Sequence, residues 1–386
     1  MKIALILNDD FSMWHFKGGL IKALVSREIE VCVIVPPGPY ISKLEAMGAK
    51  CIPIPMNRFI TPFQDLKLIY QLYRVFKTEK FDLVHNMTIK PNIFGTFAAK
   101  LAGIEKIVCL VSGLGFIFSE DLNSTKIKII RPFVILLYKW ALSISQKTSF
   151  QNKDDLDYFI KKRIIQPEKG VVIMSEGVNL NNFSSSTINP DTLEKLRKEF
   201  QIPVNSKCAL MVSARLVWSK GVREFIEVSQ LLKAEYPDWV FLMISPQDPG
   251  SPDAVSKEYI DSHQSDNLIV IDYFRQDVKD IMALADIIVL VSYYREGVPT
   301  VLIEGLSMSK PIIASNSVGC KETVEDGKNG FLVPVKNANQ LAEKLRFLMN
   351  DEAKRHVFGE YSREIAKKYF DENIVVSRII TEVYGI

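Results

Sequence analysis

The sequence lacks the features that mark several common classes of protein. It has no dense tract of Lys and Arg with interleaved aromatic residues, so nucleic acid is not an expected partner. Its five cysteines are widely spaced without a C-x-x-C pair, and no group of His, Cys, Asp and Glu has the spacing of a metal site. We therefore expect free thiols in a reducing cytoplasm, no disulfide and no bound metal.

Long hydrophobic runs are also missing. The first apolar segment stops at Asn8 with no small-residue cleavage site after it, so we expect a buried strand there rather than a signal peptide. The most hydrophobic stretch, 127–144, is interrupted by Arg131, Pro132 and Lys139, which makes it too short and too charged to cross a bilayer. This stretch is either a core helix with a charged edge or part of a surface that docks on a membrane.

The net charge of +3 is unevenly distributed along the chain. Residues 1–180 carry 24 Lys and Arg against 16 Asp and Glu, whereas residues 181–386 carry 24 against 29. A basic first half suits an anionic surface or an anionic ligand, although ordinary surface scatter explains it equally well.

Short apolar runs alternate with amphipathic segments along the whole chain. Nearly all of these runs are continuous rather than alternating, which is typical of strands buried on both faces of a parallel sheet. The strand–helix–strand pattern occurs twice, and the polar stretch 181–190 separates the two halves, so we expect two doubly wound α/β domains. The expected strands are 3–7, 31–35, 51–54, 83–85, 107–111, 148–151, 171–174, 208–213, 240–244, 268–271, 287–291, 312–314 and 331–333.

The strongest local signal directly follows the expected strand 287–291. Residues 297–300 lead into a helical pattern, and Pro299 suits the first turn of a helix because it has no N–H. Backbone N–H groups at a helix N-terminus, on the carboxyl edge of a parallel sheet, bind anions such as a diphosphate. Glu296 and Glu304 are placed to reach sugar and ribose hydroxyls; the alternative is a capping acid and an ordinary surface Glu.

A second signal follows the expected strand 208–213. Arg215 and Lys220 lie on a strand-to-helix loop from which both cations can face one diphosphate, Arg as a fork and Lys as a point charge. Fixed cations there lower the barrier to loss of a nucleoside diphosphate. Two solvated loop charges explain this pattern equally well when it is taken alone. The two signals together are far more specific than either one.

Weaker candidates lie in the first half. His85 ends an expected strand and His15 follows the first strand, and either imidazole suits a sugar or a phosphate as well as it suits core packing. Gly113 and Gly115 lie on a loop after another strand, where glycine allows an acceptor to approach the backbone closely or simply makes a turn.

The pairing of Arg215 and Lys220 with Glu296 and Glu304 resembles the donor site of the family 4 retaining glycosyltransferases. The resemblance covers essentially the whole chain. It points to the branch that builds bacterial surface polysaccharides and lipid-linked oligosaccharides, which includes the N-acetylgalactosaminyltransferase acting on undecaprenyl-diphosphate-linked diacetylbacillosamine. The segments that carry it, besides those four residues, are 85–92, 112–116, 216–225, 248–252, 292–299 and 318–322.

This resemblance implies a GT-B fold, in which two facing Rossmann-like domains enclose a cleft. Residues 1–185 would bind the acceptor, residues 186–361 would bind the nucleotide sugar, and a helix within 362–386 would cross back to the first domain. The chain departs from the family in two places. Asn8-Asp9-Asp10 stands where many members have a glycine pair, and Ile89 stands where the bacillosamine-extending enzyme has a His, so that enzyme's acceptor is not carried over.

The resemblance also assigns roles to single residues. Arg215 and Lys220 would bind the donor diphosphate, and Glu296 the transferred sugar. Glu304 would bind the ribose, and Arg275 lies in the segment that matches the base-binding loop. The backbone groups expected at the diphosphate and sugar are those of Gly297, Val298, Pro299, Thr300, Val301 and Leu302. The weaker candidates on the acceptor side are His15, His85, Lys90, Gly113 and Gly115.

We therefore expect a retaining enzyme that transfers a hexose or N-acetylhexosamine from a UDP-sugar to a polyprenyl-diphosphate-linked sugar, in bacterial surface glycan or glycoprotein glycan synthesis. The UDP-sugar is a substrate, and no cofactor is expected. A lipid-linked glycan acceptor places the enzyme in the cytoplasm, peripherally at the anionic inner face of the cell membrane. The alternatives are a UDP-sugar 2-epimerase of similar fold, which the Arg/Lys and Glu-x7-Glu set argues against, and a non-catalytic sugar-nucleotide-binding subunit.

Overall fold

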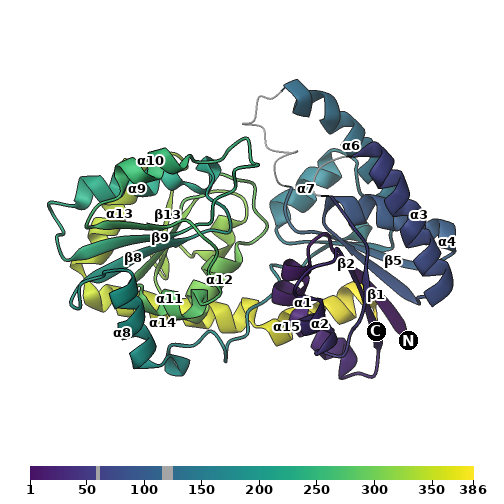
Figure 1. Ribbon diagram of the computed structural model, residues 1–386, viewed down its shortest axis with the longest axis horizontal. Coiled ribbons are helices and arrows are strands. Elements are labelled where there is room, and N and C mark those ends of the chain that lie inside the picture. Colours follow the sequence, from purple (N-terminus) through teal and green to yellow (C-terminus); the bar gives the residue numbers. More distant parts are fainter. Residues whose placement is uncertain (58–60, 115–124) are drawn as a thin grey trace. The chain divides into compact units, whose positions relative to one another are not determined.

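The structure, a computed structural model, describes residues 1–57, 61–114 and 125–386 and divides into two compact units (Figure 1). The first unit comprises residues 1–177 and 372–386, and the second comprises residues 178–371. Each unit is built on one parallel sheet, so the expected pair of Rossmann-like α/β domains is confirmed.

The sheet of the first unit has the strand order β3-β2-β1-β4-β5-β6-β7, and all of its neighbouring strands are parallel. Most of its strands are largely apolar because successive side chains enter two different cores. In β1, Ile3 and Leu5 belong to one core, and Ala4 and Ile6 belong to the other. The strands are β1 (Lys2–Ile6), β2 (Glu30–Val35), β3 (Lys50–Pro53), β4 (Leu83–Met87), β5 (Lys106–Val111), β6 (Lys147–Phe150) and β7 (Gly170–Val172).

Helices cover both faces of this sheet. The core that contains Ile3 is closed by α1, α2, α15 and η7, and the opposite face is closed by α3, α4, α6 and α7. The helices and turns of this unit are α1 (Asp10–Val25), α2 (Ile41–Glu45), α3 (Pro62–Glu79), η1 (Pro91–Gly95), α4 (Thr96–Ala102), α6 (Thr125–Ile144), α7 (Lys153–Lys161), η2 (Pro167–Lys169), α15 (Glu372–Arg378) and η7 (Ile379–Tyr384).

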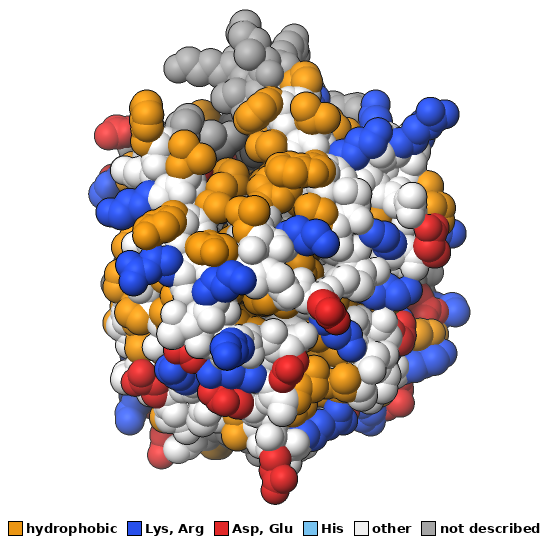
Figure 2. Space-filling view, turned by 90° about the vertical axis from the view of Figure 1, so that its right-hand side faces the viewer, with side chains coloured by type: hydrophobic (Ala, Val, Ile, Leu, Met, Phe, Trp, Pro, Cys, Tyr) orange, Lys and Arg blue, Asp and Glu red, His pale blue; other side chains and the backbone are white. Residues whose placement is uncertain are grey.

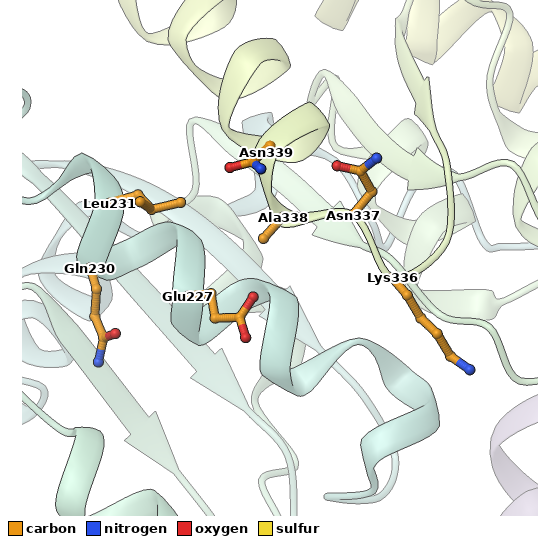
Figure 3. Close-up of a pocket in the computed structure, with 7 residues that line it drawn as sticks. All are labelled: Glu227, Gln230, Leu231, Lys336, Asn337, Ala338 and Asn339. Carbon is orange, nitrogen blue, oxygen red and sulfur yellow. The ribbon is translucent and has the colours of Figure 1, made fainter.

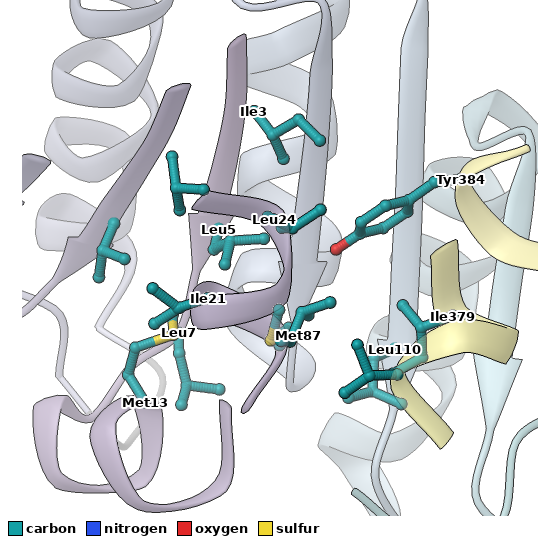
Figure 4. Packing of buried hydrophobic residues seen from close by; sticks show 14 of the residues in the cluster. Ile3, Leu5, Leu7, Met13, Ile21, Leu24, Met87, Leu110, Ile379 and Tyr384 are labelled. Atoms are coloured by element: carbon teal, nitrogen blue, oxygen red, sulfur yellow. The ribbon is translucent and has the colours of Figure 1, made fainter. Parts of the chain in front are cut away.

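The C-terminal segment completes the core of the first unit. Ile379 and Tyr384 pack among residues such as Leu5 and Leu110, which lie far away in the sequence (Figure 4). The hydroxyl of Tyr384 also lies 2.7 Å from Nδ1 of His85 in β4. Residues 372–386 are therefore an integral part of the first hydrophobic core.

The sheet of the second unit has the strand order β10-β9-β8-β11-β12-β13 and is also parallel. Its strands are β8 (Lys207–Val212), β9 (Trp239–Ile244), β10 (Leu268–Ile271), β11 (Ile287–Leu290), β12 (Ile312–Ser315) and β13 (Gly330–Val333). Its helices and turns are η3 (Ser185–Thr187), α8 (Pro190–Glu199), η4 (Trp218–Lys220), α9 (Val222–Leu232), α10 (Lys257–His263), α11 (Val278–Leu284), α12 (Thr300–Ser307), η5 (Cys320–Thr323), α13 (Ala338–Asn350), α14 (Glu352–Ile365) and η6 (Ala366–Phe370).

The chain passes from one unit to the other at two crossings, and their positions differ from those expected from the sequence. The first comes before Val178, whose N–H already donates to the carbonyl oxygen of Phe370 at 2.8 Å within the second unit. The second comes after Asp371. Helix α14 belongs to the second unit, where its Arg363 donates to the carbonyl oxygens of Leu180 at 2.9 Å and Phe183 at 3.0 Å. The divisions are thus at 177/178 and 371/372 rather than at 185/186 and 361/362.

The secondary structure follows the sequence closely. Each expected strand is present, with ends that differ by at most two residues. All five cysteines are free thiols. Among the helices of residues 1–57, 61–114 and 125–386, none combines the length and the hydrophobicity that a membrane span requires.

Candidate active site

Serine hydroxyls gather at the carboxyl edge of the second sheet. Ser213 follows β8 and Ser245 follows β9, and their Oγ atoms lie 2.7 Å apart. Ser292 follows β11, and its carbonyl oxygen accepts hydrogen bonds from Ser315 at the end of β12 and, at 2.8 Å, from Ser317. The edge is therefore polar and lined by small side chains, as a ligand-binding edge of such a sheet requires. Sequence reasoning missed these serines, although a Ser near the end of four expected strands was a readable signal.

The loops after β8 and β11 meet through an ion pair. Lys220 Nζ donates to Glu296 Oε1, which also accepts from Ser292 Oγ at 3.0 Å, and both charged side chains are largely buried. The loops approach this closely because Gly221 has φ +84°, and a Cβ there would lie 2.5 Å from the carbonyl oxygen of Val291. In this pair the carboxylate of Glu296 holds the Lys220 ammonium in place, and the ammonium offsets the negative charge of Glu296. Both groups lie at a point where an anion is expected.

Arg215 lies beside the same loop. Its Nη1 is 3.4 Å from Asp248 Oδ2, and its guanidinium carbon lies 5.4 Å from the ring centroid of Tyr294. Lys220 Nζ lies 5.5 Å from that same ring centroid. The structure therefore brings Arg215, Lys220 and Glu296 together around Tyr294, as a shared diphosphate site requires. Tyr294 and Asp248 were not predicted as site residues from the sequence, although both lie in segments that carry the resemblance.

The N-terminus of α12 opens next to these side chains. Pro299 has an extended backbone with ψ 120°, so it caps the helix, which begins at Thr300, and does not form part of the first turn as expected. The N–H of Leu302 donates to the carbonyl oxygen of Pro299 at 3.0 Å, and the N–H groups before it have no acceptor within the helix. Gly319, with φ +86°, packs so closely that a Cβ would lie 1.6 Å from the carbonyl oxygen of Gly297.

The remaining donor-side candidates occupy two different settings. Glu304 is buried one turn into α12, on the helix whose N-terminal turn contains Thr300, Val301 and Leu302. Arg275 instead binds Asp277, with Nε–Oδ1 2.8 Å and Nη2–Oδ2 2.6 Å, and also pairs with Glu199 at the end of α8. These two carboxylates raise the pKa of the Arg275 guanidinium. The structure thus places Arg275 in a separate ion-pair cluster.

The acceptor-side candidates of the first unit are mostly enclosed. Lys90 is buried and donates to Asp65 at 2.6 Å. His85 is buried beside Tyr384, and burial, followed by the charge of Lys17, holds the pKa of its imidazole well below the usual value. His15 is exposed on α1 and stacks on Phe11, and Gly113 adopts φ +124° after β5. Gly115 lies outside the described residues.

One strained residue marks the point where the strand order of the first sheet reverses. Thr88, directly after β4, has φ +72°, which is unfavourable for a β-branched residue. Its Oγ1 donates to Asn8 Oδ1 at 2.9 Å, which links the ends of the adjacent strands β4 and β1. Ligands of doubly wound sheets bind at such a reversal point. Sequence reasoning missed Thr88 because nothing in its local pattern signals a positive φ.

A pocket elsewhere in the second unit has a different lining. It lies between the last turns of α9 and the start of α13 (Figure 3). None of the residues that we predict to bind the donor lines it, so it is not part of this site. Within the described residues, no group of three or more His, Cys, Asp and Glu could hold a metal ion. The pocket is lined by Glu227, Gln230, Leu231, Lys336, Asn337, Ala338 and Asn339.

Two family models match the chain. The model for "Glycosyl transferase 4-like" matches residues 2–152, and the model for "Glycosyl transferases group 1" matches residues 193–365. The chain belongs to this glycosyltransferase family and is a glycosyltransferase, as its site and its relatives indicate. The resemblance seen in the sequence is confirmed.

Two of its relatives act on lipid-linked sugars, as their names state. The chain is 31% identical to the N,N'-diacetylbacillosaminyl-diphospho-undecaprenol alpha-1,3-N-acetylgalactosaminyltransferase of Campylobacter jejuni, over 98% of this chain and 97% of that protein. It is 28% identical to the UDP-Gal:alpha-D-GlcNAc-diphosphoundecaprenol alpha-1,3-galactosyltransferase of Escherichia coli, over 83% of this chain and 79% of that protein.

A solved structure shares the fold. Anabaena Alr3699/HepE, in complex with UDP-glucose, aligns with a TM-score of 0.81 over the full length of both chains at 20% sequence identity. This likeness confirms the fold class, which is GT-B with two parallel-sheet Rossmann-like domains.

Proposed function

We propose that this glycosyltransferase transfers a hexose or N-acetylhexosamine from a UDP-sugar to a polyprenyl-diphosphate-linked sugar, with retention at the anomeric carbon. The product would serve bacterial surface glycan or glycoprotein glycan synthesis. The names of the relatives from Campylobacter jejuni and Escherichia coli support this acceptor class, and the UDP-glucose in the complex of HepE supports the donor class.

The observation that carries the proposal is the convergence of two cations beside a helix N-terminus. Arg215 and Lys220 both lie against Tyr294, at the sheet edge from which the chain enters α12. Their charges suit the two phosphates of the donor, and the backbone N–H groups of residues 297–302 add hydrogen-bond donors. Glu296 binds the transferred sugar in this proposal.

The uridine part of the donor extends away from the two cations. Glu304 of α12 binds the ribose, and the loop that contains Arg275 binds the base. The ion pairs of Arg275 with Asp277 and Glu199 support this role because they fix the loop after β10 against the end of α8. Arg275 acts by positioning this loop.

The chemistry needs only positioning and charge stabilisation. The bond between the anomeric carbon and the donor phosphate oxygen breaks, and that oxygen keeps the electron pair. The acceptor hydroxyl attacks the same face of the sugar and passes its proton to the leaving phosphate. Arg215 and Lys220 stabilise the charge that develops on this phosphate, so neither a metal nor a cofactor is required.

The acceptor side of the proposal belongs to the first unit. His15 is exposed on α1, and Gly113 opens the loop after β5, so both suit contact with an acceptor. His85 and Lys90 are enclosed, and they act in this proposal by holding the ends of β4 in place. Because the acceptor is lipid-linked, the enzyme works peripherally at the cytoplasmic face of the cell membrane.

A donor screen tests the proposal. The full chain is incubated with a panel of UDP-hexoses and UDP-N-acetylhexosamines and a polyprenyl-diphosphate-sugar acceptor, and the product is read by mass spectrometry. We expect a mass gain of one sugar with a UDP-sugar, which the Lys220→Ala variant loses. Conversion of UDP-N-acetylglucosamine to its 2-epimer without any acceptor would instead identify an epimerase, and donor binding without turnover across the panel would identify a non-catalytic subunit.

A further inference from the structure

One face of the first unit exposes hydrophobic side chains in a regular pattern. Six residues of α3 and α6, which we call the apolar stripes, are each between 58% and 90% exposed. In both helices they recur at spacings of three and four residues, so they form one line along each helix. The other sides of these helices are buried in the cores of the unit. The apolar stripes are Phe63, Leu66 and Tyr70 of α3 and Phe133, Leu136 and Trp140 of α6.

The two stripes belong to one surface. The helix α4 contacts both α3 and α6, and the ring centroid of its Phe97 lies 4.0 Å from the ring centroid of Trp140. Leu101, one turn further along α4, is also exposed. Figure 2 shows hydrophobic side chains gathered in the upper part of one face of the molecule, with Lys and Arg side chains around them. An exposed hydrophobic patch with a charged rim marks an interaction surface.

The charges around the stripes are positive. The helices α4 and α6 contain no Asp or Glu at all. The two acidic residues of α3 are engaged elsewhere, Asp65 with the buried Lys90 and Glu79 with Lys2 and Lys50. The exposed charged residues of the three helices, among the residues whose side chains are described, are Lys67, Arg74, Lys77, Lys100 and Lys139.

We propose that this surface docks on an anionic lipid bilayer. The aromatic and leucine side chains of the stripes enter the boundary between headgroups and acyl chains, and the surrounding cations lie at the anionic headgroups. Tyr70 and Trp140 are suited to that boundary because each combines an apolar ring with a polar O–H or N–H group. A second copy of this chain fits less well, because symmetric pairing would bring Lys67, Arg74 and Lys139 against like charges.

This inference rests on the proposed function only in that a lipid-linked acceptor brings the enzyme to a membrane. The stripes belong to the first unit, whereas the donor-binding residues belong to the second. Variants of the stripes therefore leave Arg215, Lys220 and Glu296 unchanged, and lipid binding can be measured separately from transfer.

The charge contribution is tested by neutralisation. The full chain is sedimented with vesicles of phosphatidylcholine and phosphatidylglycerol, and with vesicles of phosphatidylcholine alone, at low and high salt. The triple variant Lys67→Gln, Arg74→Gln and Lys139→Gln should bind the anionic vesicles about a hundredfold more weakly than the parent, since each cation near such a surface contributes several-fold.

A matched control removes the same charge elsewhere. Lys22 of α1 and Lys195 of α8 are exposed, Lys354 of α14 is partly exposed, and all three lie outside the three helices. The triple variant with Gln at these positions should bind like the parent. Equal loss of binding in the two triple variants would overturn the proposal, because net charge and not this surface would then govern binding.

The apolar contribution is tested by the double variant Phe133→Ser and Leu136→Ser. It should weaken binding to anionic vesicles about tenfold or more, because the buried apolar area is lost. The matched control, Val204→Ser and Val357→Ser, removes exposed apolar side chains of the second unit and should bind like the parent. Parental binding by the Phe133 and Leu136 variant would overturn the proposal. The proposal would also be overturned if the parent were a dimer without lipid and this variant a monomer, while vesicle binding stayed unchanged.

Transfer to a short-chain, water-soluble acceptor is measured in parallel. Retained transfer in the stripe variants, together with lost vesicle binding, supports the docking surface and shows that these variants are folded. If the parent binds anionic vesicles through the stripes but transfers no sugar with any donor, the proposed function fails and the docking surface stands.

Discussion

The two sheets share a topology but use their charged residues differently. In the first unit, Lys17 pairs with Glu176 after β7, and Lys90 after β4 pairs with Asp65, with all four side chains almost fully enclosed. In the second unit, the side chain of Arg215 keeps 26% of its surface exposed beside Asp248. A cation near the carboxyl end of a parallel strand is therefore not in itself a ligand-binding group.

The enclosed ion pairs of the first unit and the ion pairs at the sheet edge of the second unit have different roles. An enclosed pair supports the fold, because either partner alone would be a buried charge. A pair at an open edge keeps one side of each charge available, so a phosphate can compete for the cation at little cost. This comparison predicts that the first unit responds to the loss of a cation mainly in stability, and the second mainly in turnover.

The largest expected effect is on the stability of the first unit. Lys90→Met should lower the free energy of unfolding by about 3–5 kcal/mol, because it leaves Asp65 buried without its cation. Urea unfolding followed by circular dichroism measures this. The double variant Lys90→Met and Asp65→Leu should recover most of the loss. Unchanged stability together with lost acceptor use would break the comparison and make Lys90 a ligand-binding group.

The next effect is on turnover in the second unit. Lys220→Ala should lower kcat by about a hundredfold or more, the scale for removal of one group that stabilises transition-state charge. The protein should still fold, although with lower stability, because the largely buried Glu296 loses its cation. Steady-state kinetics with the donor found in the screen measures kcat, and Lys195→Ala on the surface of α8 is the control. Near-parental activity in a folded Lys220→Ala protein would remove the donor-site assignment.

Most of the strands were predictable because they are continuous apolar runs. All six residues of β9, for example, are buried, so its hydrophobic pattern alone defines it. The crossings between the units were not predictable in this way. The polar stretch 181–190 looks like a linker, yet Arg363 binds the carbonyl oxygen of Phe183 and ties this stretch to the second unit. Such contacts join residues far apart in the sequence, and no local pattern encodes them.

The grouping of the donor-side residues was predictable for a similar reason. Arg215 and Lys220 follow β8, and Glu296 follows β11, and parallel strands end at a common edge. The partner of each residue was not predictable, because it depends on the lateral order of the strands. Asp248 reaches Arg215 only because β9 lies next to β8, and Lys90 is enclosed only because Asp65 of α3 faces it.

A smaller effect concerns the pH dependence of the first unit. His85 is buried, and its imidazole pKa is held well below 6.5, first by burial and then by the charge of Lys17. Below about pH 6.5 the unfolded chain therefore binds a proton that the folded chain does not, so stability falls with acidification by up to about 1.4 kcal/mol per pH unit. Urea unfolding between about pH 5 and pH 7 measures the slope.

Replacement of the imidazole identifies its share of that slope. His85→Gln keeps a hydrogen-bonding group near Tyr384 but does not titrate, so its stability should depend less steeply on pH over this window. His15→Gln, on the surface of α1, is the matched replacement. An unchanged slope in the His85 variant would assign the acid sensitivity to other groups.

The smallest expected effect is that of removing divalent metal ions. A donor diphosphate needs positive charge around it, and we propose that Arg215, Lys220 and the N-terminal turn of α12 supply that charge from the protein itself. Initial rates in excess EDTA should therefore equal those in added magnesium or manganese within about twofold, a barrier difference below about 0.5 kcal/mol. Complete loss of transfer in EDTA, restored by either metal, would show that the cations of the second unit are insufficient. Arg215 and Lys220 would then serve to position a metal–diphosphate complex. The contrast would be between ion pairs that support the fold in the first sheet and cations that hold a metal-bound ligand in the second.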